Sequence, residues 1–358
     1  MTRRPPAATP ARSSPTDALL PIAGGEVFLC LHFNVHGVRL RAMVDTPPLA
    51  ARLREALRPF ETPADGAADF LLRIRHSHER FPDAAPEGMT EHWRGTLPDG
   101  PPVVCHRGAV EREVLLPGLA RMRLSGCGAD MRAAPGADGW LSLGCILPAL
   151  CEFLARRGHY VVHAASLSAP VDGAPRALVL CGPSGVGKTT TALALAHAGM
   201  QLLTDDATFL FAPEPAAGPL RVWGLPRPCK VHRQTLEMMP WLRRLCDGSE
   251  PVADEYLMEL AALAGPRAHE LAEPAAVLLL EPRNPRAHRL RPLDRVDAIA
   301  RLINENVRAA DPRAEGPAGG AFRALAALAA RVPVYALSVG PKLESLDQAA
   351  RPLLSPSR

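Results

Sequence analysis

Aromatic residues are scarce in this chain, and long apolar runs are missing. Phe, Trp and Tyr make up 4% of its 358 residues, so a packed core must be built mostly from Leu, Val and Ala. The longest apolar stretch, near Trp140–Cys151, contains Pro148 and is too short to span a bilayer. The first residues contain no apolar segment of signal-peptide length. We therefore expect no membrane partner and a cytoplasmic location.

Concentrated positive charge and paired cysteines are also missing. The 41 basic residues exceed the 37 acidic ones by only four and are spread along the chain. Nucleic-acid-binding proteins usually concentrate basic residues on one face, so nucleic acid is not expected as a partner. The eight cysteines form no C-x-x-C pair and show no zinc-site spacing, which predicts free thiols in a reducing compartment.

Changes in composition predict three regions. Residues 1–21 are rich in Pro, Ala, Ser and Arg, which is typical of a disordered arm. Residues 22–135 predict a small β-rich N-terminal domain, because Glu26–Val44 alternates apolar and polar side chains around a His36-Gly37 turn. Residues 136–358 predict a second domain.

The second domain follows an α/β pattern. Strands are expected at His159–Leu167, Ala177–Cys181 and Met200–Thr204, with a helix at Lys188–Ala198 between the last two. A further strand at Ala276–Leu280 and helices toward the C-terminus continue the pattern. Strands and helices that alternate through short loops are typical of α/β folds.

One motif fits a phosphate-binding loop. Residues 182–189 read Gly-Pro-Ser-Gly-Val-Gly-Lys-Thr, which matches G-x-x-x-x-G-K-[ST] between a predicted strand and a predicted helix. The glycines let the backbone N–H groups point inward, so that they and the positive end of the helix bind phosphates. The predicted nucleotide-binding residues are Gly182, Pro183, Ser184, Gly185, Val186, Gly187, Lys188, Thr189 and Thr190.

The same motif implies ATP and Mg²⁺ as cofactors. Lys188 is expected to reach the β- and γ-phosphates, and the Thr189 hydroxyl to bind Mg²⁺. A glycine-rich turn that matches the motif by chance is the alternative, and the flanking strand and helix argue against it.

Two adjacent carboxylates follow the next predicted strand. Asp205 and Asp206 lie at its carboxyl end, and we expect this strand to run beside the strand of the phosphate loop. One aspartate, assigned here as Asp205, can bind Mg²⁺, and Asp206 can accept the proton of an attacking hydroxyl. The alternatives are a solvated turn at this pair, or a metal-organising role for Glu281 at the end of a later strand.

Three further residues are candidates for catalysis. His163, on the strand before the phosphate-loop strand, can orient an aspartate, although a core histidine bonded to the backbone is the commoner case. Arg227 and Lys230 lie in a proline-rich loop and can stabilise the charge that develops on a transferred phosphoryl group. A solvent-facing charged loop is the alternative for these two.

Residues His159–Phe211 resemble the catalytic core of HPr kinase/phosphorylase. The resemblance lies in His163, the loop Gly182–Thr189, Gly199 and the pair Asp205-Asp206, in that order. It implies an α/β P-loop kinase domain related to HPr kinase and ATP-dependent phosphoenolpyruvate carboxykinase, joined to a small β-rich N-terminal domain. It also implies phosphorylation of serine, with aspartates that serve metal binding and proton transfer, a supporting histidine, and a homo-oligomer.

The chain departs from the family at several points. Pro183 stands where the family has an acid, Thr189 stands where serine is usual, and the later Glu-x-Arg-Gly-x-Gly signature is missing. The chain is thus more similar to divergent members of the family, some of which modify ribosomally made peptides on a serine.

The sequence therefore predicts an ATP-dependent serine kinase that acts on a protein or peptide. The alternatives are an ATPase or nucleotide-sensing module that depends on Glu281, a kinase for a small molecule such as free serine, and a binding protein in which nucleotide only stabilises the fold.

Overall fold

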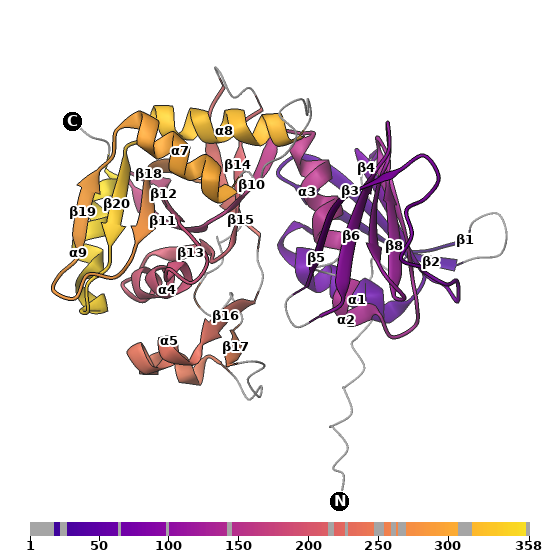
Figure 1. The fold of residues 1–358 in the computed structure, drawn as a ribbon, viewed down its shortest axis with the longest axis horizontal. Helices are drawn as coiled ribbons and strands as arrows, with labels where there is room; N and C mark the ends of the chain where they lie inside the picture. The colour runs from indigo at the N-terminus through magenta and orange to yellow at the C-terminus, as the bar shows by residue number, and fades with distance from the viewer. Residues whose placement is uncertain are drawn as a thin grey trace, which may run out of the picture. The chain divides into compact units, whose positions relative to one another are not determined.

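The computed structural model divides the chain into two compact units, Met1–Phe153 and Leu154–Arg358 (Figure 1). It describes residues 18–21, 27–63, 66–97, 100–141, 145–213, 218–225, 228–246, 254–258, 263, 270–306 and 317–355. The division falls within α3 (Leu147–Ala155), not between residues 135 and 136 as expected. The physical reason is that the Phe153 ring stacks on Phe70, with centroids 4.6 Å apart, so most of the helix belongs to the N-terminal unit.

The first unit is built around a nine-stranded sheet of order β1-β2-β3-β4-β9-β8-β7-β6-β5. Its strands are β1 Ala18–Pro21, β2 Val27–Val35, β3 Val38–Val44, β4 Phe70–His76, β5 Thr90–Thr96, β6 Pro102–Arg107, β7 Arg112–Leu116, β8 Ala120–Leu124 and β9 Gly128–Ala133. Its helices, besides most of α3, are α1 Pro47–Leu57, η1 Arg58–Phe60 and α2 Asp138–Leu141.

Strands β1 to β3 of this unit confirm one prediction and correct another. The hairpin predicted over Glu26–Val44 is confirmed, and His36 (φ 50°) and Gly37 (φ 91°) form its left-handed turn. The disordered arm predicted over residues 1–21 is wrong at its end, because Ala18–Pro21 pairs antiparallel with Val27–Cys30 of β2. The rest of the predicted arm lies outside the described residues.

The described residues of the second unit form three sheets. A six-stranded sheet has the order β13-β11-β12-β18-β20-β19, a three-stranded sheet has the order β10-β14-β15, and β16 pairs with β17. The strands are β10 His159–His163, β11 Ala165–Val171, β12 Ala174–Cys181, β13 Gln201–Thr204, β14 Ala207–Phe211, β15 Arg221–Gly224, β16 Cys229–His232, β17 Glu255–Met258, β18 Glu273–Glu281, β19 Arg289–Pro292 and β20 Val334–Ser338.

The helices of this unit vary in length. They are α4 Lys188–His197, α5 Arg233–Met238, η3 Pro240–Arg244, α7 Arg295–Asn306, α8 Pro317–Arg331, η4 Leu343–Ser345, α9 Leu346–Ala350 and η5 Arg351–Leu354. Together with the sheets they make a mixed α/β unit, as the sequence pattern predicted. None of the helices in the described ranges is both long and apolar enough to cross a bilayer.

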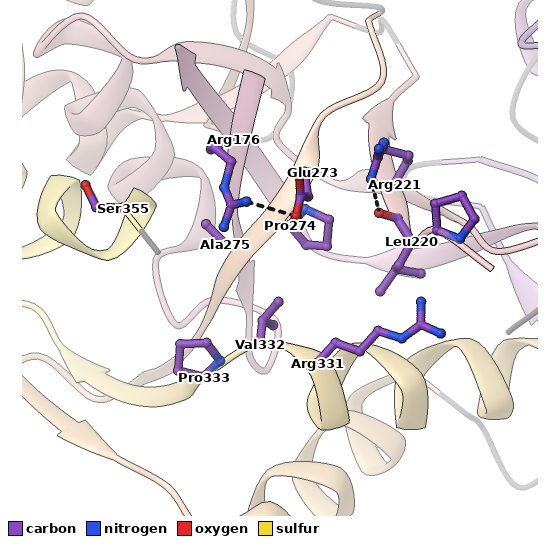
Figure 2. Close-up of a pocket in the computed structure, with 11 residues that line it drawn as sticks. Arg176, Leu220, Arg221, Glu273, Pro274, Ala275, Arg331, Val332, Pro333 and Ser355 are labelled. Atoms are coloured by element: carbon purple, nitrogen blue, oxygen red, sulfur yellow. Dashed lines mark hydrogen bonds and ion pairs between the residues drawn. The ribbon is translucent and has the colours of Figure 1, made fainter. Parts of the chain in front are cut away.

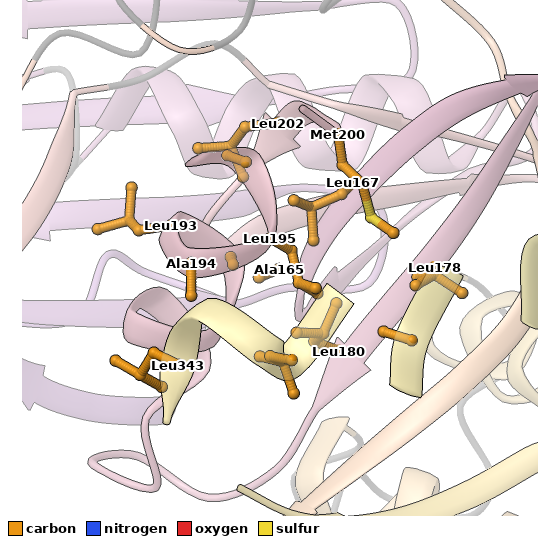
Figure 3. Close-up of a cluster of buried hydrophobic side chains, with 14 of the residues drawn as sticks. Ala165, Leu167, Leu178, Leu180, Leu193, Ala194, Leu195, Met200, Leu202 and Leu343 are labelled. Atoms are coloured by element: carbon orange, nitrogen blue, oxygen red, sulfur yellow. The ribbon is translucent and has the colours of Figure 1, made fainter. Parts of the chain in front are cut away.

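Alternate side chains of β12 point into two different cores. Leu178 and Leu180 pack with Leu193 and Leu195 of α4 on one face of the six-stranded sheet (Figure 3). Val179 and its alternating neighbours face the other side, where α7 and α8 cover the sheet (Figure 1). A strand buried on both faces reads as a continuous apolar run, which is how β12 appears in the sequence.

The strand predicted over His159–Leu167 is wrong as a single element. It is two strands, β10 and β11, that break at Ala164 and join different sheets. The break is stabilised because the Ala164 N–H group lies 2.9 Å from the Val162 carbonyl oxygen and 3.0 Å from that of Asp206.

The neighbour expected for β13 is also wrong. β13 pairs with β11, and β11 in turn pairs with β12, so one strand separates β13 from the strand of the glycine loop. β11 takes this place because the tight Asp172-Gly173 turn folds it directly back against β12. The carboxyl end of β13 still reaches the loop region, as the contacts below show.

Candidate active site

A left-handed backbone gives the loop after β12 its shape. Gly182, Gly185 and Gly187 have φ angles of 148°, 78° and 102°, values that side chains with a Cβ rarely adopt. At Gly182 a Cβ would also lie only 3.1 Å from the Leu280 carbonyl oxygen of the neighbouring strand. The loop therefore has the curled backbone that its motif predicts, directly before the N-terminus of α4.

Lys188 lies buried over this loop. Its Nζ donates to the carbonyl oxygens of Gly182 at 2.7 Å and Pro183 at 3.2 Å. Burial lowers the pKa of Lys188, and the carboxylates of Asp206 and Glu305 act in the opposite direction. The ammonium is thus held within the loop, in the field of two carboxylates from distant parts of the chain.

Thr189 and Asp205 form the first polar pair beside the loop. The Thr189 Oγ1 hydroxyl donates to Oδ2 of Asp205 at 3.3 Å, and Asp205 is only 7% exposed. Thr190, the next residue, is turned away, because its Oγ1 lies 2.9 Å from Oγ1 of Thr235 on α5. The predicted loop residues thus divide between the phosphate loop and the packing of α4.

His163 and Asp206 form the second pair. Nδ1 of His163 lies 2.7 Å from Oδ1 of Asp206, and their side chains are 46% and 38% exposed. The pairing of β10 with β14 places them together, because His163 lies opposite Ala207 in the register. His163 is therefore not the buried, backbone-bonded histidine that the sequence favoured.

The bend between β13 and β14 places Asp205 and Asp206 in different environments. The Thr204 hydroxyl accepts hydrogen bonds from the N–H groups of Asp206 at 3.4 Å and Ala207 at 3.2 Å. This local turn buries Asp205 next to α4 and leaves Asp206 half-exposed next to β10. Two adjacent carboxylates can consequently perform different tasks.

The C-terminal end of α7 contributes residues that sequence reasoning missed. The Oδ1 atom of Asn306 accepts a hydrogen bond from the His163 N–H group at 2.8 Å, and its Nδ2 donates to the Leu302 carbonyl oxygen. Glu305 is near enough to Lys188 to affect its pKa. The separation of 143 residues between His163 and Asn306 left no motif that could have joined them.

Glu281, the alternative candidate for the metal-organising acid, is paired with two arginines and a serine. Its Oε1 lies 3.0 Å from Nη1 of Arg301 and 3.3 Å from Nη2 of Arg291, and Ser338 donates to its Oε2. The hydrogen bond from Arg301 holds the pKa of Glu281 below its usual range. Through these contacts the Glu281 carboxylate connects α7 and β19 to β18.

The structure describes only one of the two basic residues predicted to act from the proline-rich loop. Arg227 lies outside the described residues. Lys230 is on β16, and its Nζ is 2.7 Å from Oε2 of Glu255 on β17. That ion pair offsets the charge of Lys230, so a role in phosphoryl transfer stays a prediction.

The oxygen atoms beside the glycine loop suit Mg²⁺ better than a metal held by protein side chains alone. Across the described ranges, no group of three or more His, Cys, Asp and Glu side chains could hold a metal ion. Mg²⁺ in nucleotide sites needs less, because one or two protein oxygens, phosphates and waters complete its shell. The adjacent oxygens of Thr189 and Asp205 fit that requirement, and the curled glycine loop fits a phosphate group.

Comparison with known proteins finds similarity among solved structures only. No family model matches the chain, and no curated protein matches it. Among solved structures, the chain is similar to the HPr(Ser) kinase/phosphatase from Coxiella burnetii, with 16% identity and a TM-score of 0.25 over 53% of this chain and 95% of that one. What the site can do chemically therefore has to be inferred from its own side chains.

Proposed function

We propose that this chain is an ATP-dependent kinase that transfers the γ-phosphoryl group to a serine hydroxyl of a protein or peptide. One observation carries the proposal: two side-chain pairs lie beside a glycine loop with a buried lysine, and each pair contains one carboxylate. The pairs are Thr189–Asp205 and His163–Asp206. A binding protein would need the loop alone, whereas phosphoryl transfer needs a metal ligand and a proton acceptor as well.

Each residue has a distinct task in this proposal. The loop amides and Lys188 bind the phosphates, while Thr189 and Asp205 hold Mg²⁺, which would neutralise charge on the phosphates when bound. Asp206 accepts the proton of the attacking hydroxyl, and His163 orients that carboxylate. The fit of loop and oxygens described above supports ATP and Mg²⁺ as the cofactors.

The bond changes balance as follows. The serine oxygen forms a bond to the γ-phosphorus, and the bond from that phosphorus to the β–γ bridging oxygen breaks. ADP leaves with the electron pair of the broken bond, and the serine proton moves to Asp206. No oxidant or other co-reactant is required.

The exposure of the acceptor pair favours a large substrate. The side chains of His163 and Asp206 are 46% and 38% exposed, so the hydroxyl is approached from an open surface. A small-molecule kinase usually encloses its substrate in a pocket. Serine on a protein or peptide is consequently preferred over free serine.

The proposal predicts a labelled acceptor. We expect incubation of the chain with γ-labelled ATP, Mg²⁺ and a lysate of the source cell to label one protein or peptide band. Lys188→Ala should abolish the label, and Asp206→Asn should lower the rate about 100-fold or more, as is usual when a general base is removed. Asp172→Asn, at an exposed turn of the same unit, should leave the rate unchanged.

Other outcomes would contradict the proposal in identifiable ways. Release of free phosphate without a labelled acceptor, lost in Glu281→Gln, would establish an ATPase instead. Label on a small molecule would establish a small-molecule kinase. Full activity in Asp206→Asn would remove the base assignment.

A further inference from the structure

The strand that carries His163 lies at the edge of its sheet. Among the described strands, β10 pairs with β14 alone, and β14 pairs with β15 on its other side. An edge strand presents unpaired N–H and C=O groups, to which another extended chain can add. This edge ends at His163, which contacts Asp206, so a chain added here would reach the acceptor pair.

Alternate residues of β10 direct their backbone groups away from β14. Before the strand, the Gly158 carbonyl oxygen accepts from the Ala212 N–H group at 2.8 Å. After the strand, the Ala164 N–H group donates to the Asp206 carbonyl oxygen at 3.0 Å. Both pairs continue the antiparallel register, in which only every second residue bonds to the partner strand. The even-numbered residues of β10 therefore bond to β14, and the odd-numbered residues point outward.

Two of the outward-facing positions differ in what they meet. The His163 N–H group donates to Oδ1 of Asn306 at 2.8 Å, which agrees with its outward direction. Val161, two residues earlier, is 41% exposed, and its N–H and C=O groups have no hydrogen-bond partner among the residues that the structure describes. The edge is thus covered by a side chain at His163 and open at Val161.

The cavity drawn in Figure 2 does not lead to the acceptor pair. It has a volume of about 460 Å³ and lies near the starts of the parallel strands β12, β18 and β20, whereas the glycine loop follows the other end of β12. Its lining includes neither His163 nor Asp206. The acceptor therefore approaches these two residues from elsewhere, and the open edge of β10 leads directly to them.

We infer that an extended segment of the acceptor polypeptide adds to the edge of β10 through the backbone groups of Val161. The inference rests on the proposed function and names how its substrate is held. Strand addition joins main chain to main chain, so it accepts many side chains and fixes the position of each by the register. In an antiparallel pairing, the residue opposite His163 has its Cβ about 4.5–5.5 Å from the Cβ of His163, on the same face. A serine there lies beside the His163–Asp206 pair.

Hydrogen exchange of the full chain, resolved to single residues by NMR, tests the edge without any substrate. We expect the Val161 amide to exchange at least about tenfold faster than the Val162 amide, because exchange at Val162 requires the ladder with β14 to open. Addition of a synthetic peptide that spans the labelled serine should then slow exchange at Val161.

Removal of the outward N–H group provides the kinetic test. Proline lacks this group and is tolerated on edge strands where the N–H faces solvent, so Val161→Pro should leave the ladder with β14 intact. We expect it to raise KM for the acceptor peptide about threefold to tenfold, the usual effect of one lost hydrogen bond, without changing KM for ATP. Val161→Thr keeps the N–H group and should recover the affinity.

A matched control separates this effect from that of proline in general. Val110→Pro makes the same exchange in the turn before β7, where the valine is 85% exposed, and should change neither KM. Circular dichroism checks that each variant is folded.

A backbone scan of the acceptor peptide gives the signature of strand addition. Methylation of one peptide nitrogen at a time should raise KM at every second residue near the serine and leave the residues between unchanged. The reason is that only alternate residues of an added strand direct their N–H groups toward β10.

Results that overturn the inference differ from those that contradict the kinase. A Val161 amide protected in the free chain would show a covered edge, and protection that grows with protein concentration would assign the edge to a second copy. An acceptor KM unchanged in Val161→Pro, or a methylation scan without alternation, would show that the acceptor binds elsewhere while the kinase proposal stands. No labelled acceptor at all would contradict the proposed function, and this inference with it.

Discussion

At the scale of single residues, the site depends on what holds His163 in place. The His163 ring is 2.7 Å from Asp206, while its backbone N–H group donates to Asn306. Asn306 itself is anchored to the last turn of α7 through the Leu302 carbonyl oxygen. A side chain 143 residues away in the sequence thus holds the backbone of His163, one member of the proposed acid–base pair.

Removing this anchor should slow catalysis more than binding. We expect Asn306→Leu to lower kcat about threefold to tenfold, the usual effect of one lost hydrogen bond, with little change in KM for ATP. Asn306→Asp keeps an acceptor oxygen and should recover most of the rate. Steady-state kinetics on both variants checks this, and equal losses of kcat in the two would show a merely structural role.

At the scale of elements, the glycine loop depends on its backbone angles. Gly187 has a φ of 102°, and a Cβ added there would meet nothing within 4 Å. Its replacement therefore tests the left-handed conformation without a steric clash. The same substitution at Gly182 would add a close contact with Leu280.

Gly187→Ala should destabilise the loop. A left-handed conformation costs a residue with a Cβ about 1–2 kcal/mol, which is about 2–8 °C in Tm for a unit of this size. ATP affinity should fall as well, because the amides that bind phosphate lose their shape. Thermal melts and ATP titration check this against Gly126→Ala, where φ is not left-handed and no atom lies within 4 Å. Equal melts and affinities for the two variants would contradict it.

Glu281 joins three elements, and its effect on stability should depend on pH. Its pKa is lowered in the folded state by Arg301, so its contribution is present above the unfolded pKa of about 4.3 and is lost as pH falls through the folded pKa. We expect Glu281→Gln to lower the free energy of unfolding by about 1 kcal/mol at pH 7, with the difference shrinking steadily below about pH 5.

Urea unfolding at several pH values measures this difference. Glu344→Gln, at an exposed glutamate near the C-terminus, is the control and should show no such dependence. A Glu281→Gln effect that stays constant down to pH 3 would mean that packing, and not charge, accounts for it.

At the scale of the whole molecule, the chain is two units, and every contact assigned to the proposed site lies within Leu154–Arg358. We therefore expect a fragment of residues 154–358 to bind ATP within about threefold of the full chain. Fluorescence titration with a labelled ATP analogue measures this, with Lys188→Ala in the same fragment as the control. A folded fragment with tenfold weaker binding would show that the site needs the first unit.

Part of this architecture could be predicted from the sequence because it depends on local spacing. The hairpin over Glu26–Val44 follows from alternation and a turn at His36-Gly37, and the strand–loop–helix around Gly182–Thr189 follows from glycines and apolar runs. The aspartate pair could likewise be located at a strand end. These features are set within about 20 residues of chain, where backbone preferences and side-chain period dominate.

Only the tertiary structure decided the features that bring together residues far apart in the sequence. The break at Ala164, the insertion of β11 between β13 and β12 and the contact of Asn306 with His163 all belong to this group. An apolar strand can satisfy its hydrogen bonds beside several partners, so its own residues do not specify its neighbour. The packing of both cores selects one arrangement, and that arrangement places the side chains of the proposed sites.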